Sequence, residues 1–295
     1  MKGYEMTNYK LTFSALNFNA AGTSPDSAMM ATTSSSIDAA MFGAGFDIEV
    51  REVQKHLALT KQFVRSVVNG THKNAILQGP PGLGKSHVVT KVLQEEGKLE
   101  KQDYFVVKGH ITPTSLFVLL GLLRNKGQVL VLDDCDDVFK TELGFNLIKA
   151  ALDPDNRTVS YQSQRMPLIN GKPVGDFVYD GTLIICTNQD PRRLKMSRAA
   201  QHMAAVLSRA ILWPLKWDTP ERKFAQIYNM VIDADYLAFD PQTALDVKQK
   251  KDLLQFIWDD IGNIQDLDLR LPQKIAVEIK TNTNWRETCK IFIGI

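Results

Sequence analysis

Apolar and polar positions along residues 74–213 follow two different periods in alternation. Short apolar runs that end in polar or glycine-rich residues predict five buried strands, at 74–78, 104–108, 128–132, 182–186 and 210–213. Segments with apolar residues at helical spacing lie between them and predict helices at 86–96, 115–123, 141–152 and 197–207. Strands and helices that alternate in this order favour a parallel α/β sheet with helices on both faces.

The rest of the chain divides into helical and irregular parts. A near-helical apolar spacing that starts near Asp47 predicts a helix, which Asn69-Gly70 ends. Beyond residue 217 the spacing predicts three more helices, at 220–231, 241–259 and 268–280. We therefore expect a flexible arm rich in Ser, Thr, Ala and Gly (1–45), a main α/β domain (46–216), and a small α-helical domain with a C-terminal tail (217–295).

Composition narrows the class of protein only a little. With 295 residues and 44% hydrophobic content, the chain can bury one large core or a main domain plus a smaller one. The formal net charge of +2 singles out neither nucleic acid nor a membrane surface, so any basic site must be local. The three cysteines are dispersed, without a C-x-x-C pair, and fit a reducing cytosol.

The sequence also favours a cytoplasmic protein that makes no membrane contact. No apolar run reaches the roughly 18 residues needed to span a bilayer. The N-terminus lacks the charged-then-apolar order of a signal peptide.

Residues 79–86 fit the pattern G-x-x-x-x-G-K-[ST] at every fixed position, between a predicted strand and a predicted helix. This context serves anion capture, because glycines let the backbone approach a phosphate chain and amide N–H groups point at it. Lys85 would neutralise the β- and γ-phosphates, and Ser86 would hold Mg²⁺. The alternative, a glycine-rich turn that merely starts a helix, does not require both side chains. The predicted nucleotide-binding residues are Gly79, Pro80, Pro81, Gly82, Leu83, Gly84, Lys85, Ser86 and His87.

Two acidic residues, Asp133 and Asp134, follow the predicted strand 128–132. Four apolar residues that close on an acid are typical of a strand buried on both faces whose carboxyl end opens onto a ligand crevice. Asn188 follows the strand 182–186 in the same way. Taken alone, Asn188 would by default be interpreted as a turn residue that ends a strand.

The order of these motifs resembles that of AAA+ ATPases. Lys85 and Ser86 match the Walker A motif of that family, Asp133-Asp134 match Walker B, and Asn188 matches the sensor 1 position. The resemblance implies that ATP and Mg²⁺ bind, that Asp133 orders the metal through water, and that Asp134 polarises the attacking water. Asn188 would contact the γ-phosphate or that water.

One departure from the family pattern concerns Asp134, because the second Walker B residue is usually Glu. Aspartate is shorter by one methylene, so its carboxylate would lie about 1 Å too far from the water for full effect. We therefore expect slow hydrolysis. Asp136 and Asp137 are expected to be solvated or to cap a helix.

The resemblance also assigns roles to two arginines. Arg209, just before the last predicted strand, matches the arginine finger that a neighbouring subunit supplies, which implies a ring or open ring of identical chains. Arg270, at the start of a helix in the C-terminal lid, matches sensor 2 and would reach the bound nucleotide. Arg192, Arg193 and Arg198 are less well placed as fingers. The alternatives are a surface salt bridge for Arg209 and a solvent-facing helix start for Arg270.

Residues 157–162 and 176–179 are β-rich runs on either side of the turn pair Asn170-Gly171, which predicts a β-hairpin. A hairpin before the sensor 1 strand is similar to one in a large AAA+ branch of DNA motors and protein remodellers, where it projects towards substrate. Arg165 and Lys172 would then touch DNA phosphates, or remain merely solvated. The loop 108–113 contains no aromatic residue, which disfavours a polypeptide-threading ring.

Three functional hypotheses remain open at this stage. The favoured one is an ATPase that remodels DNA or a DNA-bound protein complex, as a helicase loader or motor does. Chains with a comparable Val-Leu-Asp-Asp-Cys-Asp run resemble ATPases of bacteriophages. Such a protein would act in the host cytoplasm. The second is a nucleotide-gated adaptor with weak or vestigial hydrolysis. The third is a kinase that uses the same loop, which Asn188, Arg209 and the C-terminal lid disfavour.

Overall fold

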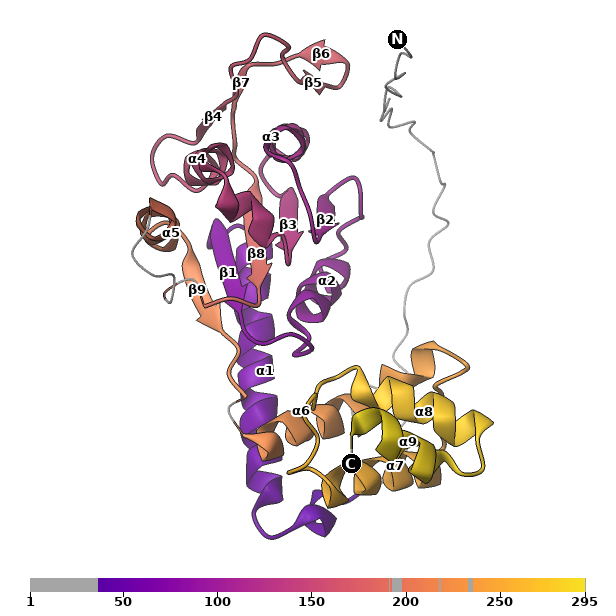
Figure 1. Cartoon of the computed structure of the whole chain (residues 1–295). Helices are drawn as coiled ribbons and strands as arrows, with labels where there is room; N and C mark the ends of the chain where they lie inside the picture. The colour runs from indigo at the N-terminus through magenta and orange to yellow at the C-terminus, as the bar shows by residue number, and fades with distance from the viewer. Residues whose placement is uncertain (1–36, 191, 193–197, 218, 233–235, 295) are drawn as a thin grey trace, which may run out of the picture.

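A five-stranded parallel sheet forms the centre of the molecule (Figure 1). The computed structural model describes residues 37–190, 192, 198–217, 219–232 and 236–294. Along the sheet the strand order is β2-β3-β8-β1-β9, so strands adjacent in space are not adjacent in sequence. The strands are β1 (Asn74–Gln78), β2 (Tyr104–Lys108), β3 (Val129–Asp133), β8 (Thr182–Thr187) and β9 (Ile211–Pro214).

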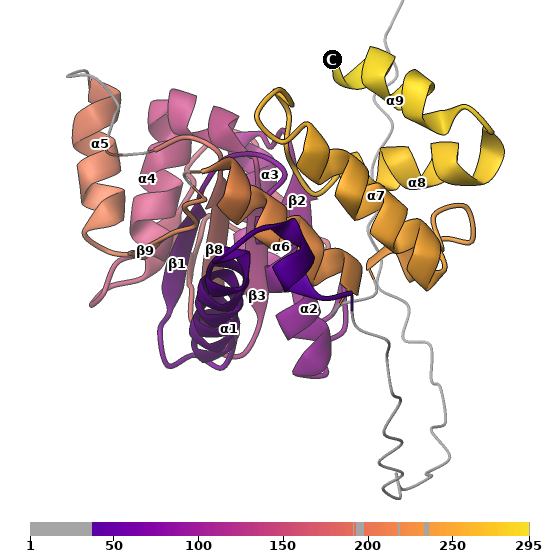
Figure 2. The same ribbon diagram turned by 90° about the horizontal axis from the view of Figure 1, so that it is seen from below.

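Helices cover both faces of this sheet, as Figure 2 shows. Every residue of β3 and β8 is buried, because alternate side chains enter two separate apolar clusters. Leu130 and Ile185 pack with α3, α4 and α5, whereas Val131 and Ile184 pack with α2 and the C-terminal half of α1. The predicted fold class, an α/β P-loop sheet between helices followed by a small helical lid, is confirmed.

The helices lie close to the predicted positions. Thr112 and Thr141 each accept a hydrogen bond from a backbone N–H in the first turn of α3 and α4, which fixes where these helices begin. The helices of the sheet domain are α1 (Phe46–Val68), α2 (Lys85–Glu95), α3 (Pro113–Leu122), the 3₁₀ helix η2 (Asp136–Lys140), α4 (Glu142–Ala151) and α5 (Arg198–Leu207). Among the residues described, no helix is long and apolar enough to cross a membrane.

The C-terminal helices form a separate apolar cluster, which we call the lid. It consists of α6 (Pro220–Ile232), η4 (Tyr236–Phe239), α7 (Val247–Asp259), α8 (Leu271–Thr281) and α9 (Trp285–Ile293). An Asp246/Gln249 capping box fixes the start of α7 at Val247, six residues later than the predicted start at 241. The sequence did not predict α9, whose segment was assigned to the tail.

Helix α1 belongs to both parts of the molecule. Its first half packs into the lid through Phe46, Val50 and Val53, and its second half packs under the sheet through Val64 and Val67. Figure 1 shows this helix running from beside the lid along the sheet. One continuous helix of 23 residues therefore connects the two apolar cores.

The end of the predicted arm is part of the folded structure. Residues 1–36 lie outside the described residues, but residues 37–45 contain the 3₁₀ helix η1 (Ala39–Phe42) and pack against the lid. Phe42 is fully buried, and the Tyr228 hydroxyl donates a hydrogen bond to the carbonyl of Ile37. Within the described residues the fold thus begins before residue 46.

The predicted hairpin is present as two short antiparallel pairs. β4 (Thr158–Ser160) pairs with β7 (Asp176–Val178), and β5 (Leu168–Ile169) pairs with β6 (Lys172–Pro173). Asn170 and Gly171 have φ values of 51° and 77°, as a two-residue I′ turn requires. The β5–β6 tip lies at the end of the molecule opposite the lid (Figure 1).

Phe42→Ala tests whether η1 is part of the lid core. Phe42 is 0% exposed and its ring contacts those of Phe46, Phe224, Tyr228 and Trp258. Because the substitution leaves a cavity among these rings, we expect it to lower the free energy of unfolding by about 3–5 kcal/mol. Urea unfolding measures this, with Met41→Ala at the neighbouring exposed position as control. Equal, small losses in both variants would show that η1 is only loosely attached.

Candidate functional site

Four of the predicted site residues, Lys85, Ser86, Asp133 and Asn188, meet where three adjacent strands end. β8 pairs in parallel with β1 on one side and with β3 on the other, with Gln78 opposite Thr187 and Asp133 opposite Cys186. The residues that follow these strands therefore share one edge of the sheet. This register brings Asn188 between the loop 79–84 and Asp133.

The loop between β1 and α2 has the backbone shape that close approach to a phosphate chain requires. Gly82 and Gly84 have φ values of 74° and 76°, a backbone conformation that residues other than glycine rarely adopt. The loop starts where the N–H of Gly79 donates to the carbonyl of Thr187, at 3.2 Å. Helix α2 begins directly after Gly84, so its N-terminus faces the same space.

Lys85 lies buried at the centre of this edge. Its ammonium Nζ donates hydrogen bonds to the carbonyls of Gly79 (2.8 Å) and Pro80 (2.9 Å) and to Asn188 Oδ1 (2.6 Å). Burial lowers the pKa of the Lys85 ammonium, and the charges of Asp134 and Asp133 act in the opposite direction. The sequence placed Lys85 and Asn188 at one nucleotide, and the structure brings them into direct contact.

Ser86 and Asp133 form the second close pair, since the Ser86 hydroxyl donates to Asp133 Oδ1. A hydroxyl and a carboxylate side by side fit Mg²⁺, which prefers oxygen ligands and usually keeps several waters and phosphate oxygens. Among the described residues there is no group of three or more His, Cys, Asp or Glu that could hold a metal by themselves. Ser86 and Asp133 are thus the residues that would hold the ion, together with the substrate.

The acidic run after β3 is more structured than the sequence suggested. Asp134 is exposed and has a φ of 54°, and its backbone N–H donates to the carbonyl of Cys186 at 3.0 Å. Asp136, expected to be solvated or to cap a helix, is partly buried and accepts a hydrogen bond from the Thr187 hydroxyl at 2.9 Å. Burial raises the pKa of Asp136, and the Thr187 bond opposes that shift. This bond joins the acidic segment after β3 to the end of β8.

Two lid residues hold the phosphate loop in ways that the sequence did not reveal. Gln226 of α6, 2% exposed, donates from Nε2 to the carbonyl of Leu83 at 2.7 Å. The backbone N–H of Leu269 donates to the carbonyl of Gly82 at 3.1 Å. A Cβ at Gly82 would lie 2.4 Å from Asp268 Oδ2, so the lid packs directly on the loop. The available signal was a pair of polar residues, Gln226 and Asn229, three positions apart among the apolar residues of α6.

His87 and Arg270 lie where the lid meets α2. The His87 ring contacts Tyr236 of η4 edge-on, at 6.1 Å between centroids. Arg270 is exposed at the start of α8, its backbone N–H donates to Asp268 Oδ1, and its charge acts on Tyr236. Both residues therefore border the side of the phosphate loop that the lid covers.

Arg209 lies away from this cluster. It comes just before β9, which pairs in parallel with β1. Because the nucleotide-site residues follow the carboxyl ends of the strands, Arg209 lies at the opposite edge of the sheet, where the strands begin. There its Nη1 donates to the carbonyl of Ala205 (2.8 Å) and its Nε lies 3.5 Å from Asp153 Oδ2. Arg209 therefore cannot serve the nucleotide site of its own chain. Arg192 pairs with Asp190, while Arg193 and the side chain of Arg198 lie outside the described residues.

The hairpin cations are exposed, as predicted. Arg165 and Lys172 lie in the hairpin beside two exposed apolar side chains, Met166 (46%) and Leu168 (60%). His110, in the loop after β2, lies 3.1 Å from Asp137 and so contacts the segment that follows Walker B.

No protein-family model matches the chain. It is 25% identical over 245 residues to the "uncharacterized 36.7 kDa protein in nrdC-mobD intergenic region" of Enterobacteria phage T4, a match that covers 82% of this chain and 74% of the relative. Among solved structures it is similar to domain III of the Thermotoga maritima replication initiation protein DnaA (TM-score 0.47, 12% identity, 81% of this chain and 92% of that one). It is also similar to Brucella abortus NtrX in complex with ADP (TM-score 0.46, 14% identity, 79% of this chain), of which it spans 50%.

Gln226→Leu tests the contact between lid and loop. The substitution leaves the buried Leu83 carbonyl without its donor, so we expect a loss of about 1–3 kcal/mol in the free energy of unfolding. Urea unfolding measures the loss, and Gln242→Leu at an exposed lid position serves as the control. A variant as stable as the control would show that the Gln226 bond contributes nothing.

Proposed function

We propose that this chain, an AAA+ type ATPase core by its motifs and fold, hydrolyses ATP with Mg²⁺ to drive remodelling of DNA or a DNA-bound protein complex. The observation that carries the proposal is the convergence of Lys85, Ser86, Asp133 and Asn188 at one sheet edge. These are the groups that bind phosphate, hold the metal and orient water in P-loop hydrolysis.

In the proposed binding step, the backbone N–H groups of the loop and the N-terminus of α2 bind the triphosphate. Lys85 exchanges its bonds with the Gly79 and Pro80 carbonyls for phosphate oxygens, and Asn188, which accepts from Lys85 in this structure, positions the ammonium. Ser86 and Asp133 would hold Mg²⁺, which would neutralise charge on the phosphates.

Hydrolysis requires a positioned water and a cation at the γ-phosphate. Asp134, exposed directly after β3, is the proposed group that polarises the water, together with Asn188. Arg270, exposed at the start of α8 in the lid, is the proposed second cation at the phosphates. Arg209 acts on the nucleotide of a neighbouring copy, because it lies at the amino edge of its own sheet, and this is why we propose a homo-oligomeric ring or open ring.

The hydrogen bonds between the lid and the phosphate loop would couple nucleotide binding to a change in the position of the lid. Gln226 and Leu269 hydrogen-bond the carbonyls of Leu83 and Gly82, so a change in the loop alters bonds that fix the lid. A nucleotide that favours one loop conformation would favour one angle between lid and sheet.

DNA is the proposed substrate class because cations lie at the end of the molecule far from the lid. Arg165 and Lys172 are exposed on the hairpin, and Met166 and Leu168 beside them offer apolar contact to bases. A relative in phage T4 is compatible with work in the host cytoplasm.

A nucleotide-gated adaptor is the second candidate, and the observation that favours it is Asp134. This residue is shorter than the usual glutamate and is held at a positive φ of 54°. In this case ATP controls assembly and phosphate release is negligible.

Substitutions of Lys85 and Arg209 should separate ATP binding from ATP hydrolysis. We expect Lys85→Ala to abolish ATP binding, since it removes the central phosphate ligand. Arg209→Ala should leave binding by the same chain nearly intact and lower turnover by roughly 10³-fold or more, as loss of an arginine finger does. Calorimetric titration with a non-hydrolysable ATP analogue and phosphate release measure the two effects. Normal turnover by assembled Arg209→Ala would refute the finger assignment.

DNA should stimulate ATP turnover, and the stimulation should weaken as salt rises because phosphate contacts release counterions. We expect the Arg165→Ala/Lys172→Ala double variant to need more DNA for the same stimulation. Lys248→Ala, which removes a charge from the exposed surface of α7, is the control. Turnover that ignores single- and double-stranded DNA at every salt concentration would count against DNA as substrate. Negligible turnover together with ATP-dependent assembly would instead favour the adaptor.

A further inference from the structure

The lid places a carboxylate directly on the phosphate loop. A Cβ at Gly82 would lie 2.4 Å from Oδ2, 2.5 Å from Cβ and 2.7 Å from Cγ of Asp268. Because all three distances are well below van der Waals contact, the Asp268 side chain fills the space beside the Gly82 backbone. An acid therefore lies against the loop whose backbone N–H groups would bind the negatively charged phosphates.

The carboxylate of Asp268 is held in place by the turn at the start of α8. Its Oδ1 accepts hydrogen bonds from the backbone N–H groups of Arg270 (2.8 Å) and Leu271 (3.2 Å). These bonds fix the orientation of the side chain. Among the described residues no Lys, Arg or His forms an ion pair with Asp268, so its negative charge is not neutralised at short range.

The two neighbours of Asp268 fix its backbone to the lid and to the loop. Leu267 and Leu269 are buried in the apolar core of the lid, at 4% and 6% exposure. The N–H of Leu269 donates to the carbonyl of Gly82 at 3.1 Å, and its Cδ1 would lie 3.1 Å from a Cβ at Gly84. Withdrawal of the Asp268 carboxylate from the loop therefore requires movement of the lid.

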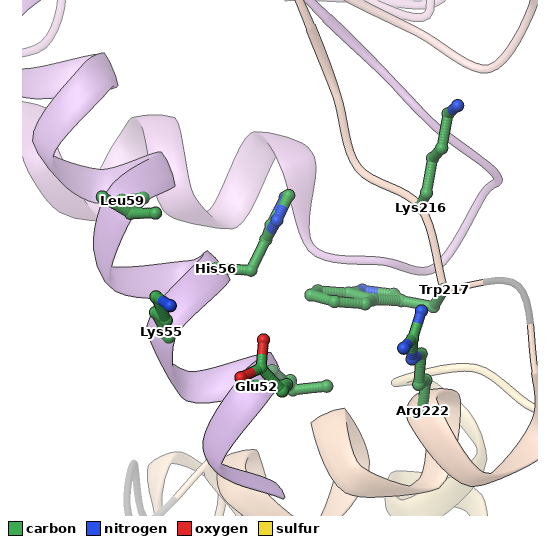
Figure 3. A pocket seen from close by; sticks show the side chains of 8 residues that line it. Glu52, Lys55, His56, Leu59, Lys216, Trp217 and Arg222 are labelled. Carbon is green, nitrogen blue, oxygen red and sulfur yellow. The ribbon is translucent and has the colours of Figure 1, made fainter. Parts of the chain in front are cut away.

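The lid is in turn held to α1, whose second half packs under the sheet. Trp217, in the connection between sheet and lid, is 5% exposed and meets the His56 ring of α1 edge to face, with 5.1 Å between centroids (Figure 3). Arg222 of α6 pairs with Glu49 of α1, with Nε 2.9 Å from Oε2. Contacts outside the nucleotide site thus help to keep Asp268 on the loop.

A charge at this position acts on any anion that the loop binds. Asp268 touches the loop, so its carboxylate lies within the Debye length of about 8–10 Å at moderate salt from a phosphate bound there. Repulsion over such a distance in a partly exposed site weakens binding by roughly three- to fivefold for each unit of ligand charge. The effect is therefore larger for a triphosphate than for a diphosphate.

We propose that Asp268 is a charge gate: while the lid lies on the loop, its carboxylate lowers the affinity of the site for nucleotides, and for ATP more than for ADP. This inference rests on the proposed function, since it takes the loop to bind nucleoside phosphates. A lid position that withdraws Asp268 binds ATP more tightly, so ATP favours that position. The lid thereby responds to the charge of the bound nucleotide.

Two neutral variants test the gate without removing the turn. Asp268→Asn and Asp268→Ser each lose the charge and keep an oxygen that can accept the bonds from Arg270 and Leu271. Asp266→Asn, at an exposed position two residues earlier, makes the same change in net charge and is the matched control.

Calorimetric titration of the full chain measures the dissociation constants of a non-hydrolysable ATP analogue and of ADP, each with Mg²⁺. We expect both neutral variants to lower the constant about tenfold for the ATP analogue and by a smaller factor for ADP. Asp266→Asn should change neither constant by more than about twofold, and the gain in the Asp268 variants should shrink as salt rises, because ions screen the repulsion.

The possible failures distinguish the gate from the nucleotide site itself. If the wild-type chain binds the ATP analogue and neither neutral variant binds it more tightly, the gate is wrong and the nucleotide site stands. An equal gain for both nucleotides, or a gain that salt does not change, would also overturn the gate, because packing rather than charge would then explain it. If none of the proteins binds ATP analogue or ADP, the gate and the proposed function fail together.

Discussion

The candidate site depends on one feature of the sheet, the position of β8 between β1 and β3. Each strand contributes a short polar segment at its carboxyl end, and only this order allows the β8 segment to contact both neighbours. Lys85 can then donate to Asn188 on one side, while Thr187 donates to Asp136 on the other. A different strand order would leave the same motifs in the chain but separate their side chains by a strand width.

The phosphate loop is held from two sides, by the sheet and by the lid. The Gly79 N–H bonds to β8, and the carbonyls of Gly82 and Leu83 accept bonds from lid groups. These bonds therefore fix the conformation of the loop without a ligand. Its conformation and the lid position form one bonded unit, in which Gly82 has no room for a side chain.

Much of the sheet could be predicted from the sequence, because strands buried on both faces give short, uninterrupted apolar runs between polar ends. Asn170-Gly171 likewise identified the hairpin, since few pairs tolerate two positive φ values. The Gln226–Leu83 bond could not be predicted, because it joins residues 143 positions apart and leaves no local pattern. Helix α9 was missed because it has nine residues, too few turns for a periodic pattern to be distinguished from an irregular tail.

Helix α1 has a mechanical consequence. With 23 residues it extends about 35 Å, from aromatic rings clustered around Phe42 to the turn that leads into the amino end of β1. That far end adjoins the strand which Arg209 precedes. A stiff helix anchored at both ends converts a tilt at one end into a displacement at the other, so a rotation of the lid would be transmitted to the amino edge of the sheet, where Arg209 lies.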